Sequence, residues 1–170
     1  MNSSVDAQPI WRRPGCDFAG VLARWLLGGV FISMGLSKAL HPEAFLKLVR
    51  QYEMVSQPFL LNSIAATLPW FEVFCGLLLL CGVAVRGSAL MLLAMLLPFT
   101  GVVLKRALEI AGSQNLPFCA VRFDCGCGNG EVIICHKLAE NSFLILLACL
   151  LLVGLGQRLS LRFSLFKKDN

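Results

Sequence analysis

The 170-residue chain contains 57% hydrophobic and 15% charged residues, and its mean hydropathy is +0.74. A water-soluble domain needs more charge to cover its surface, so this composition excludes one and predicts a single membrane-embedded domain over residues 1–170. The net charge of +5 does not indicate nucleic-acid binding, because the fifteen Lys and Arg residues are scattered at the ends of apolar runs.

Two apolar segments in the first half of the chain predict membrane-spanning helices over about residues 18–38 and 64–85, since one crossing takes about 20 apolar residues. The first contains Arg24, which we expect to snorkel to the lipid headgroups. The second contains a single charge, Glu72, and Pro69, which we expect in its first turns, where a missing amide donor is tolerated.

The stretch between these two segments has a different pattern. After His41-Pro42-Glu43, apolar residues recur at helical spacing among charged ones, at Phe45, Leu48, Val49 and Tyr52. This pattern predicts an amphipathic helix in the membrane interface, which either caps the bundle or gates a substrate.

Two further apolar runs predict spans over about residues 87–106 and 138–157, the first of them kinked at Pro98. They leave a Cys-rich loop at residues 107–137. The predicted fold is therefore all-α: a polytopic membrane protein with a four-transmembrane-helix bundle, an amphipathic helix and a Cys-rich loop.

The orientation follows from the distribution of positive charge, although each side of the membrane receives seven Lys and Arg residues. On the side with both termini, the positive charges lie in short segments beside the spans that are nearly free of acids. On the other side, the positive charges are spread over two longer loops that also contain acids. We therefore expect both termini in the cytoplasm. The two sets are Arg12, Arg13, Arg86, Arg158, Arg162, Lys167 and Lys168, against Lys38, Lys47, Arg50, Lys105, Arg106, Arg122 and Lys137.

Four of the eight cysteines, Cys119, Cys125, Cys127 and Cys135, fall in the loop that this topology places in an oxidising compartment. Cys125 and Cys127 are separated only by Gly126 and are followed by Gly128, so a bridge between them is strained and easily broken. We therefore predict Cys125 and Cys127 as the catalytic redox pair. Cys119 and Cys135 are the supporting thiols, which either resolve that pair or form a separate structural bridge.

The same loop permits two other interpretations, a static disulfide and a soft-metal site. The metal site would use sulfur and imidazole ligands, at Cys119, Cys125, Cys127, Cys135 and His136. The other four cysteines, Cys16, Cys75, Cys81 and Cys149, are interpreted as small apolar residues, with Cys75 the best candidate for an extra thiol within reach of the loop.

A carboxylate inside a span needs a partner, because at the centre of the membrane it costs about 2.5 to 3.5 kcal/mol. Lys38 ends the first span on the side where the second begins, so we expect an intramembrane ion pair between Lys38 and Glu72. Proton transfer at this pair is the alternative. Lys105 and Arg106 end the third span at the same level. We expect these cations to favour the thiolate form of the loop cysteines by lowering their pKa.

Three motifs in this order, Gly35–Lys38, Leu68–Glu72 and Cys125–Gly128, resemble the MauE methylamine-utilisation family within the DoxX-like four-helix membrane proteins. The resemblance covers about residues 18–157. It implies a protein of the bacterial inner membrane whose Cys-rich loop faces the periplasm. It also implies a part in maturing a disulfide-rich periplasmic enzyme with a thioredoxin-like partner, the client in MauE being the methylamine dehydrogenase small subunit. The chain departs from the family at Gly128 and Asn129, where an aromatic residue is common.

Three functional hypotheses remain at this stage. The first is thiol-disulfide redox or maturation chemistry without a cofactor. The second is a non-catalytic accessory or assembly subunit of a larger membrane complex linked to a quinone, and the third is handling of a soft metal ion. Each has membrane lipid as a partner, and the sequence alone leaves open whether the protein is an enzyme.

Overall fold

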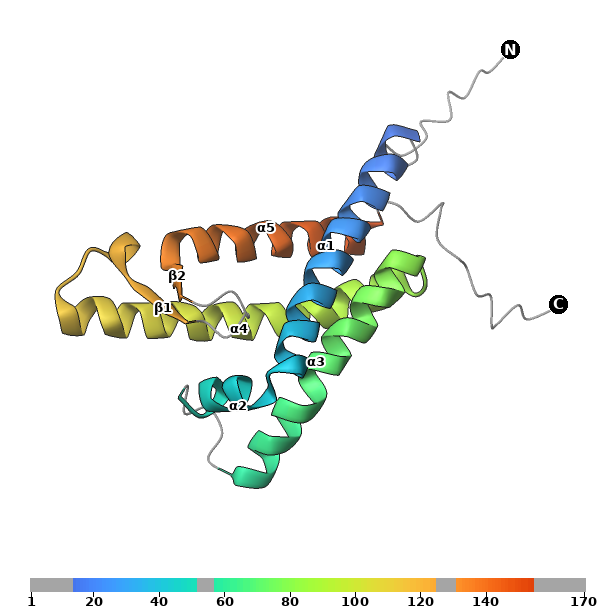
Figure 1. Ribbon diagram of the computed structural model, residues 1–170. Coiled ribbons are helices and arrows are strands. Elements are labelled where there is room, and N and C mark those ends of the chain that lie inside the picture. Colours follow the sequence, from blue (N-terminus) through green and yellow to red (C-terminus); the bar gives the residue numbers. More distant parts are fainter. Residues whose placement is uncertain (1–13, 52–56, 125–130, 155–170) are drawn as a thin grey trace, which may run out of the picture.

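A computed structural model describes residues 14–51, 57–124 and 131–154, and Figure 1 shows the arrangement of its elements. In chain order these are α1 (Pro14–Leu40), α2 (Pro42–Gln51), α3 (Pro58–Cys81), α4 (Val85–Gln114), the short 3-10 helix η2 (Phe118–Ala120), β1 (Arg122–Asp124), β2 (Glu131–Ile133) and α5 (Ile134–Val153).

Four of these helices are long and apolar enough to cross a membrane, over Phe18–Leu40, Phe59–Cys81, Val85–Gln114 and Ile134–Val153. The fold class predicted from the sequence is confirmed: this is an all-α, multi-pass membrane protein. The short helix α2 lies in the region where the sequence predicts an amphipathic helix.

The bounds of the spans differ from the expected ones. α3 begins at Pro58, so Pro69 lies inside the helix and not in its first turns. α4 continues past residue 106 to Gln114, and Glu109 in this extension lies 3.3 Å from Arg106 and 3.9 Å from Lys105. A hydropathy pattern ends at the first charges, but a helix need not end there. With α5 beginning at Ile134, the loop is shorter than the predicted 107–137.

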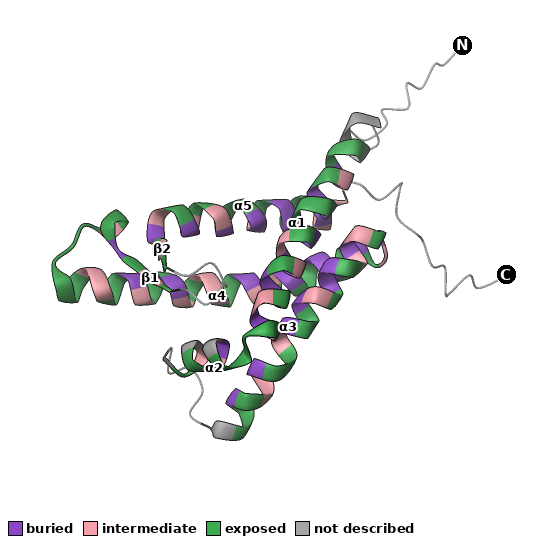
Figure 2. Cartoon of the chain, viewed as in Figure 1, coloured by how far each residue is buried: buried purple, intermediate pink, exposed green. Residues whose placement is uncertain are grey.

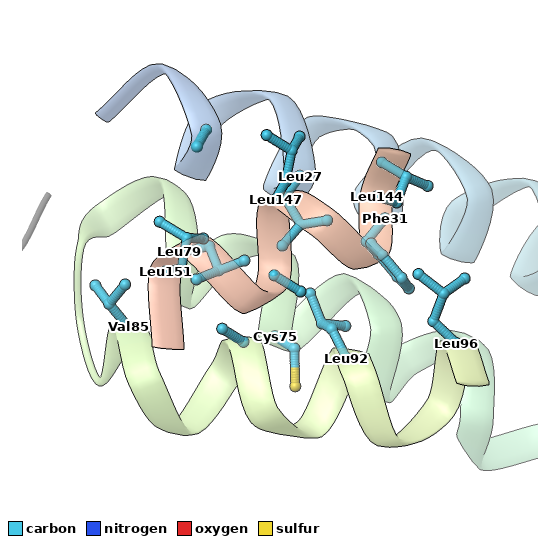
Figure 3. Close-up of a cluster of buried hydrophobic side chains, with 13 residues drawn as sticks. Leu27, Phe31, Cys75, Leu79, Val85, Leu92, Leu96, Leu144, Leu147 and Leu151 are labelled. Carbon is cyan, nitrogen blue, oxygen red and sulfur yellow. The ribbon is translucent and has the colours of Figure 1, made fainter. Parts of the chain in front are cut away.

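The four long helices form two pairs that cross (Figure 1): α1 runs along α3, and α4 runs along α5. A first hydrophobic cluster fills the crossing and receives side chains from all four helices, as Figure 3 shows. Its labelled members are Leu27, Phe31, Cys75, Leu79, Val85, Leu92, Leu96, Leu144, Leu147 and Leu151.

Much of the remaining helix surface is apolar yet exposed (Figure 2), as expected where lipid is the solvent. On α1 and α3 this surface carries large side chains, among them Phe18, Leu22, Trp25, Leu26, Trp70, Phe71, Phe74 and Leu77.

Arg24 does not snorkel to the headgroups as the sequence suggested. Its side chain is buried, and its Nε donates a hydrogen bond to the carbonyl oxygen of Leu79, 3.2 Å away. α3 ends at Cys81, and the carbonyls of a last helical turn have no donors within the helix. Arg24 supplies such a donor, and its guanidinium lies against Gly82, whose φ of 72° ends the helix.

Glycines allow the backbones of α1 and α3 to approach closely. A Cβ built on Gly28 would lie 2.8 Å from the carbonyl oxygen of Gly76, and one built on Gly35 would lie 2.7 Å from that of Pro69. Small residues at such contacts permit dense packing between helices in a membrane. The α1–α3 pair therefore depends on residues that have no side chain.

Replacing Gly28 with Ala should lower the free energy of unfolding by about 1 to 3 kcal/mol, because the added methyl meets backbone that cannot yield without shifting a helix. Thermal unfolding of the purified protein in detergent measures this effect. Gly29→Ala is the matched control, since nothing lies within 4 Å of its Cβ position. Equal behaviour of the two variants would contradict the close helix contact.

Candidate functional site

A β-hairpin occupies the loop between α4 and α5, where no strands were expected from the sequence. Arg122, Phe123 and Asp124 pair in antiparallel register with Ile133, Val132 and Glu131. The burial alternates along both strands: the middle residues are half-buried, and their neighbours are exposed. The hairpin thus has one face against the bundle and one face outward.

The inner face of the hairpin packs on a second hydrophobic cluster, which forms at the end of the bundle opposite the α3–α4 turn. Its buried members are Met34, Val103, Ala107, Val121 and Ile134, and Phe123 and Val132 of the hairpin pack against them. Because Met34 belongs to α1 and Val103 to α4, the cluster attaches the hairpin to both helix pairs.

A disulfide between Cys119 and Cys135 joins η2 to the first turn of α5, with the two Cα atoms 5.1 Å apart. The sequence offered two roles for these residues, and in this structure they form the bridge that closes the loop. Cys119 is exposed, whereas Cys135 is half-buried and packs on the second cluster.

The catalytic pair predicted from the sequence, Cys125 and Cys127, lies outside the described residues. The residues on either side of this segment are described: Asp124 and Glu131 are register partners at the strand ends that residues 125–130 connect. Six residues of sequence join these paired ends, and Cys125 and Cys127 are among them.

The alternative metal set shares two residues with the disulfide. In this structure the sulfurs of Cys119 and Cys135 are bonded to each other and are not thiolate ligands, and His136 is exposed on α5. Within residues 14–51, 57–124 and 131–154, no group of three or more His, Cys, Asp or Glu side chains is placed to hold a metal ion.

A buried ion pair lies at the same end of the bundle. Nζ of Lys38 is 2.7 Å from Oε1 and 2.8 Å from Oε2 of Glu72, and the two side chains are only 5% and 7% exposed. The same Nζ lies 5.4 Å from the centre of the Phe45 ring and 5.8 Å from that of Phe99. The cation therefore contacts side chains of α2, α3 and α4 from its own position on α1.

Both charges depend on this pairing, because the low dielectric around them makes an isolated charge costly. The ammonium donates to both carboxylate oxygens, and the aromatic rings supply further attraction. Lys38 also lies in the last turn of α1, where the helix dipole favours a positive charge. Removing either partner leaves the other buried and uncompensated.

Replacing Lys38 with Met should destabilise the protein by about 3 to 5 kcal/mol, because the Glu72 carboxylate loses its counter-charge. The double variant Lys38→Met/Glu72→Gln should recover most of that loss, since no buried charge remains. A double-mutant cycle on thermal unfolding in detergent measures the coupling. Lys105→Met is the control: that side chain is 80% exposed, and its loss should change stability by less than about 0.5 kcal/mol. An additive cycle would contradict the pairing.

Sequence reasoning missed two buried polar residues on α5, Lys137 and Asn141, the second of which contacts α4. Lys137, which was assigned to the loop, is 1% exposed in the first turn of α5, with its Nζ 2.9 Å from Oε2 of Glu140. Asn141 is fully buried, and its Nδ2 donates to Oγ1 of Thr100 at 3.1 Å. The signal was present in the sequence, because Lys137 and Asn141 share the three- and four-residue spacing of a helix face with the buried Leu144 and Ala148.

Cys75 was expected to be an extra thiol near the loop, and this expectation was wrong. Its side chain is 2% exposed and belongs to the first cluster at the helix crossing (Figure 3), because that face of α3 turns inward. Cys81 and Cys149 are free and exposed on α3 and α5, and the side chain of Cys16 lies outside the described set.

The fold and the site together define a multi-pass, four-helix membrane protein with a disulfide-anchored hairpin at one end of its bundle. A family model described as methylamine utilisation protein MauE matches residues 16–154. This match covers most of the chain, which therefore belongs to the MauE family. Comparison with curated proteins and with solved structures returned no match.

Proposed function

We propose that this protein is a thiol-disulfide redox or maturation protein of the bacterial inner membrane. It assists a disulfide-rich periplasmic enzyme of methylamine utilisation and acts with a thioredoxin-like partner. Membership of the MauE family supports the link to methylamine utilisation. The observation that carries the proposal is the disulfide-anchored hairpin, whose paired strand ends flank the segment with Cys125 and Cys127.

The hairpin suits thiol exchange because it fixes the two residues between which the Cys125–Cys127 segment runs. The register pairs Asp124 with Glu131, so the six residues between them begin and end at neighbouring positions. Cys125 and Cys127 are two of these six residues, and a disulfide between two cysteines so close in sequence is strained and readily exchanged.

The proposed exchange moves two electrons from the client enzyme to the Cys125–Cys127 disulfide in two steps. A thiolate of the client enzyme attacks the Cys125–Cys127 disulfide and forms a mixed disulfide, and the other loop sulfur leaves as thiolate. A second client thiolate then attacks the mixed bond and closes the client's disulfide. Two electrons have passed to Cys125 and Cys127, and the disulfide form of a thioredoxin-fold partner accepts them in the same way.

The buried Lys38–Glu72 ion pair takes no part in the exchange and contributes by fixing the helices on which the hairpin packs. Lys38 follows Met34 by one helical turn on α1, and Met34 belongs to the cluster on which the hairpin packs. By joining α1 to α3 and by contacting Phe99 of α4, Lys38 holds the helices that carry the hairpin at fixed positions.

Trapping tests the exchange chemistry. Cys125→Ser or Cys127→Ser leaves one loop thiol without its neighbour, so a mixed disulfide with a thioredoxin-fold protein should accumulate at least tenfold over the wild type. Non-reducing electrophoresis and peptide mapping of membranes from cells grown on methylamine measure it. Cys149→Ser, which removes an exposed thiol on α5, is the control and should trap nothing new. Failure of both loop variants to capture such a partner would overturn the proposal.

Labelling tests the orientation, with both termini in the cytoplasm and the hairpin in the periplasm. After mild reduction of intact cells, an impermeant maleimide should modify the exposed Cys119, whereas a cysteine introduced as Asn170→Cys should react only after permeabilisation. The reverse pattern would place the hairpin in the cytoplasm, where disulfides do not persist, and would remove the basis of the proposed chemistry.

A further inference from the structure

The two sulfurs of the Cys119–Cys135 disulfide have different surroundings. Cys119 lies in the short helix η2 and is exposed, as is Ala120, whereas the preceding Phe118 is half-buried and packs on the second cluster. Cys135 is half-buried in the first turn of α5 and packs on the second hydrophobic cluster. Attack on a disulfide depends on access to the sulfur that is attacked. The greater exposure of Cys119 therefore favours attack at this residue over attack at Cys135.

The position of Cys135 also suits it to be the sulfur that leaves. It is the second residue of α5, and the amide groups of a first helical turn have no acceptors within the helix. The cap residue Ile133 makes no side-chain hydrogen bond there, and no acidic residue lies in this turn. The partial positive charge of the helix end is thus available to a thiolate at Cys135.

The hairpin does not depend on the disulfide alone for its attachment. The amide of Ile134 donates to the carbonyl oxygen of Val121 at 3.2 Å, and the strands pair from Arg122 to Asp124. Phe123 also packs on the second cluster. These contacts involve neither sulfur, so we expect them to remain when the S–S bond opens and the bridge to exchange without unfolding of the site.

We propose that the Cys119–Cys135 disulfide is a second exchange site of this protein, with Cys119 as the sulfur attacked and Cys135 as the leaving thiolate. The inference rests on the proposed thiol-disulfide function and extends it to a bond outside the Cys125–Cys127 pair. The reductant is a thioredoxin-fold protein in its dithiol form. Its first thiolate bonds to Cys119 and releases Cys135, and its second thiolate then closes the partner's own disulfide. Two electrons and two protons pass to Cys119 and Cys135.

The test uses the full-length oxidised chain with Cys125→Ser and Cys127→Ser, in detergent, so that only the second site contributes. The probe is a bacterial thioredoxin whose second active-site cysteine is replaced by serine, which stops the reaction at the mixed disulfide. Rapid acid quenching, alkylation and peptide mapping identify the two halves of the product. We expect the adduct on Cys119 and the alkylated thiol on Cys135, at least tenfold in excess over the opposite assignment.

Three outcomes would overturn the inference. Equal adducts on both sulfurs, or an excess on Cys135, would remove the assigned polarity. The absence of any adduct, under conditions in which the probe does react with Cys125 or Cys127 of the wild-type chain, would show that the bridge is inert while the proposed function stands. The absence of any adduct in both chains would remove the proposed function as well. Circular dichroism of the serine variant establishes that it is folded.

Discussion

The buried contact between Lys38 and Glu72 is the constraint on which the rest of the structure depends. Two charges inside an apolar bundle are tolerated only when each satisfies the other, so the last turn of α1 and the middle of α3 must meet at one level. The rings of Phe45 and Phe99 surround the same ammonium, which extends the constraint to α2 and α4. The ion pair adds to the register that the close glycine contacts of α1 and α3 set, since burial of apolar side chains gives little driving force where lipid is equally apolar.

The hairpin depends on that register through the second hydrophobic cluster. Met34 of α1 and Val103 of α4 lie beneath Phe123 and Val132, so the platform for the hairpin exists only when both helix pairs are in place. The disulfide then joins η2 to the start of α5 at the same end of the bundle. The membrane-embedded helices thus hold the β1–β2 hairpin in a defined position.

A helical bundle that holds a hairpin at its surface suits the proposed thiol-disulfide chemistry. Exchange between thiols and disulfides needs accessible sulfur atoms at defined positions, and it needs no deep pocket or bound cofactor. A short strand pair with one apolar face and one exposed face supplies such positions at the surface of a protein that is mostly surrounded by lipid. The unequal exposure of Cys119 and Cys135 adds a direction to the exchange.

The sequence by itself determined the number of spans, the amphipathic helix and the need of Glu72 for a cationic partner, because hydropathy and the cost of buried charge are local properties. Only the tertiary structure decided the partners of Arg24 and Asn141, since each finds its partner on another helix, whose position composition does not give. The strands were also decided there: three-residue segments such as β1 are too short for a periodic signal, and they exist because Phe123 and Val132 have a cluster to cover.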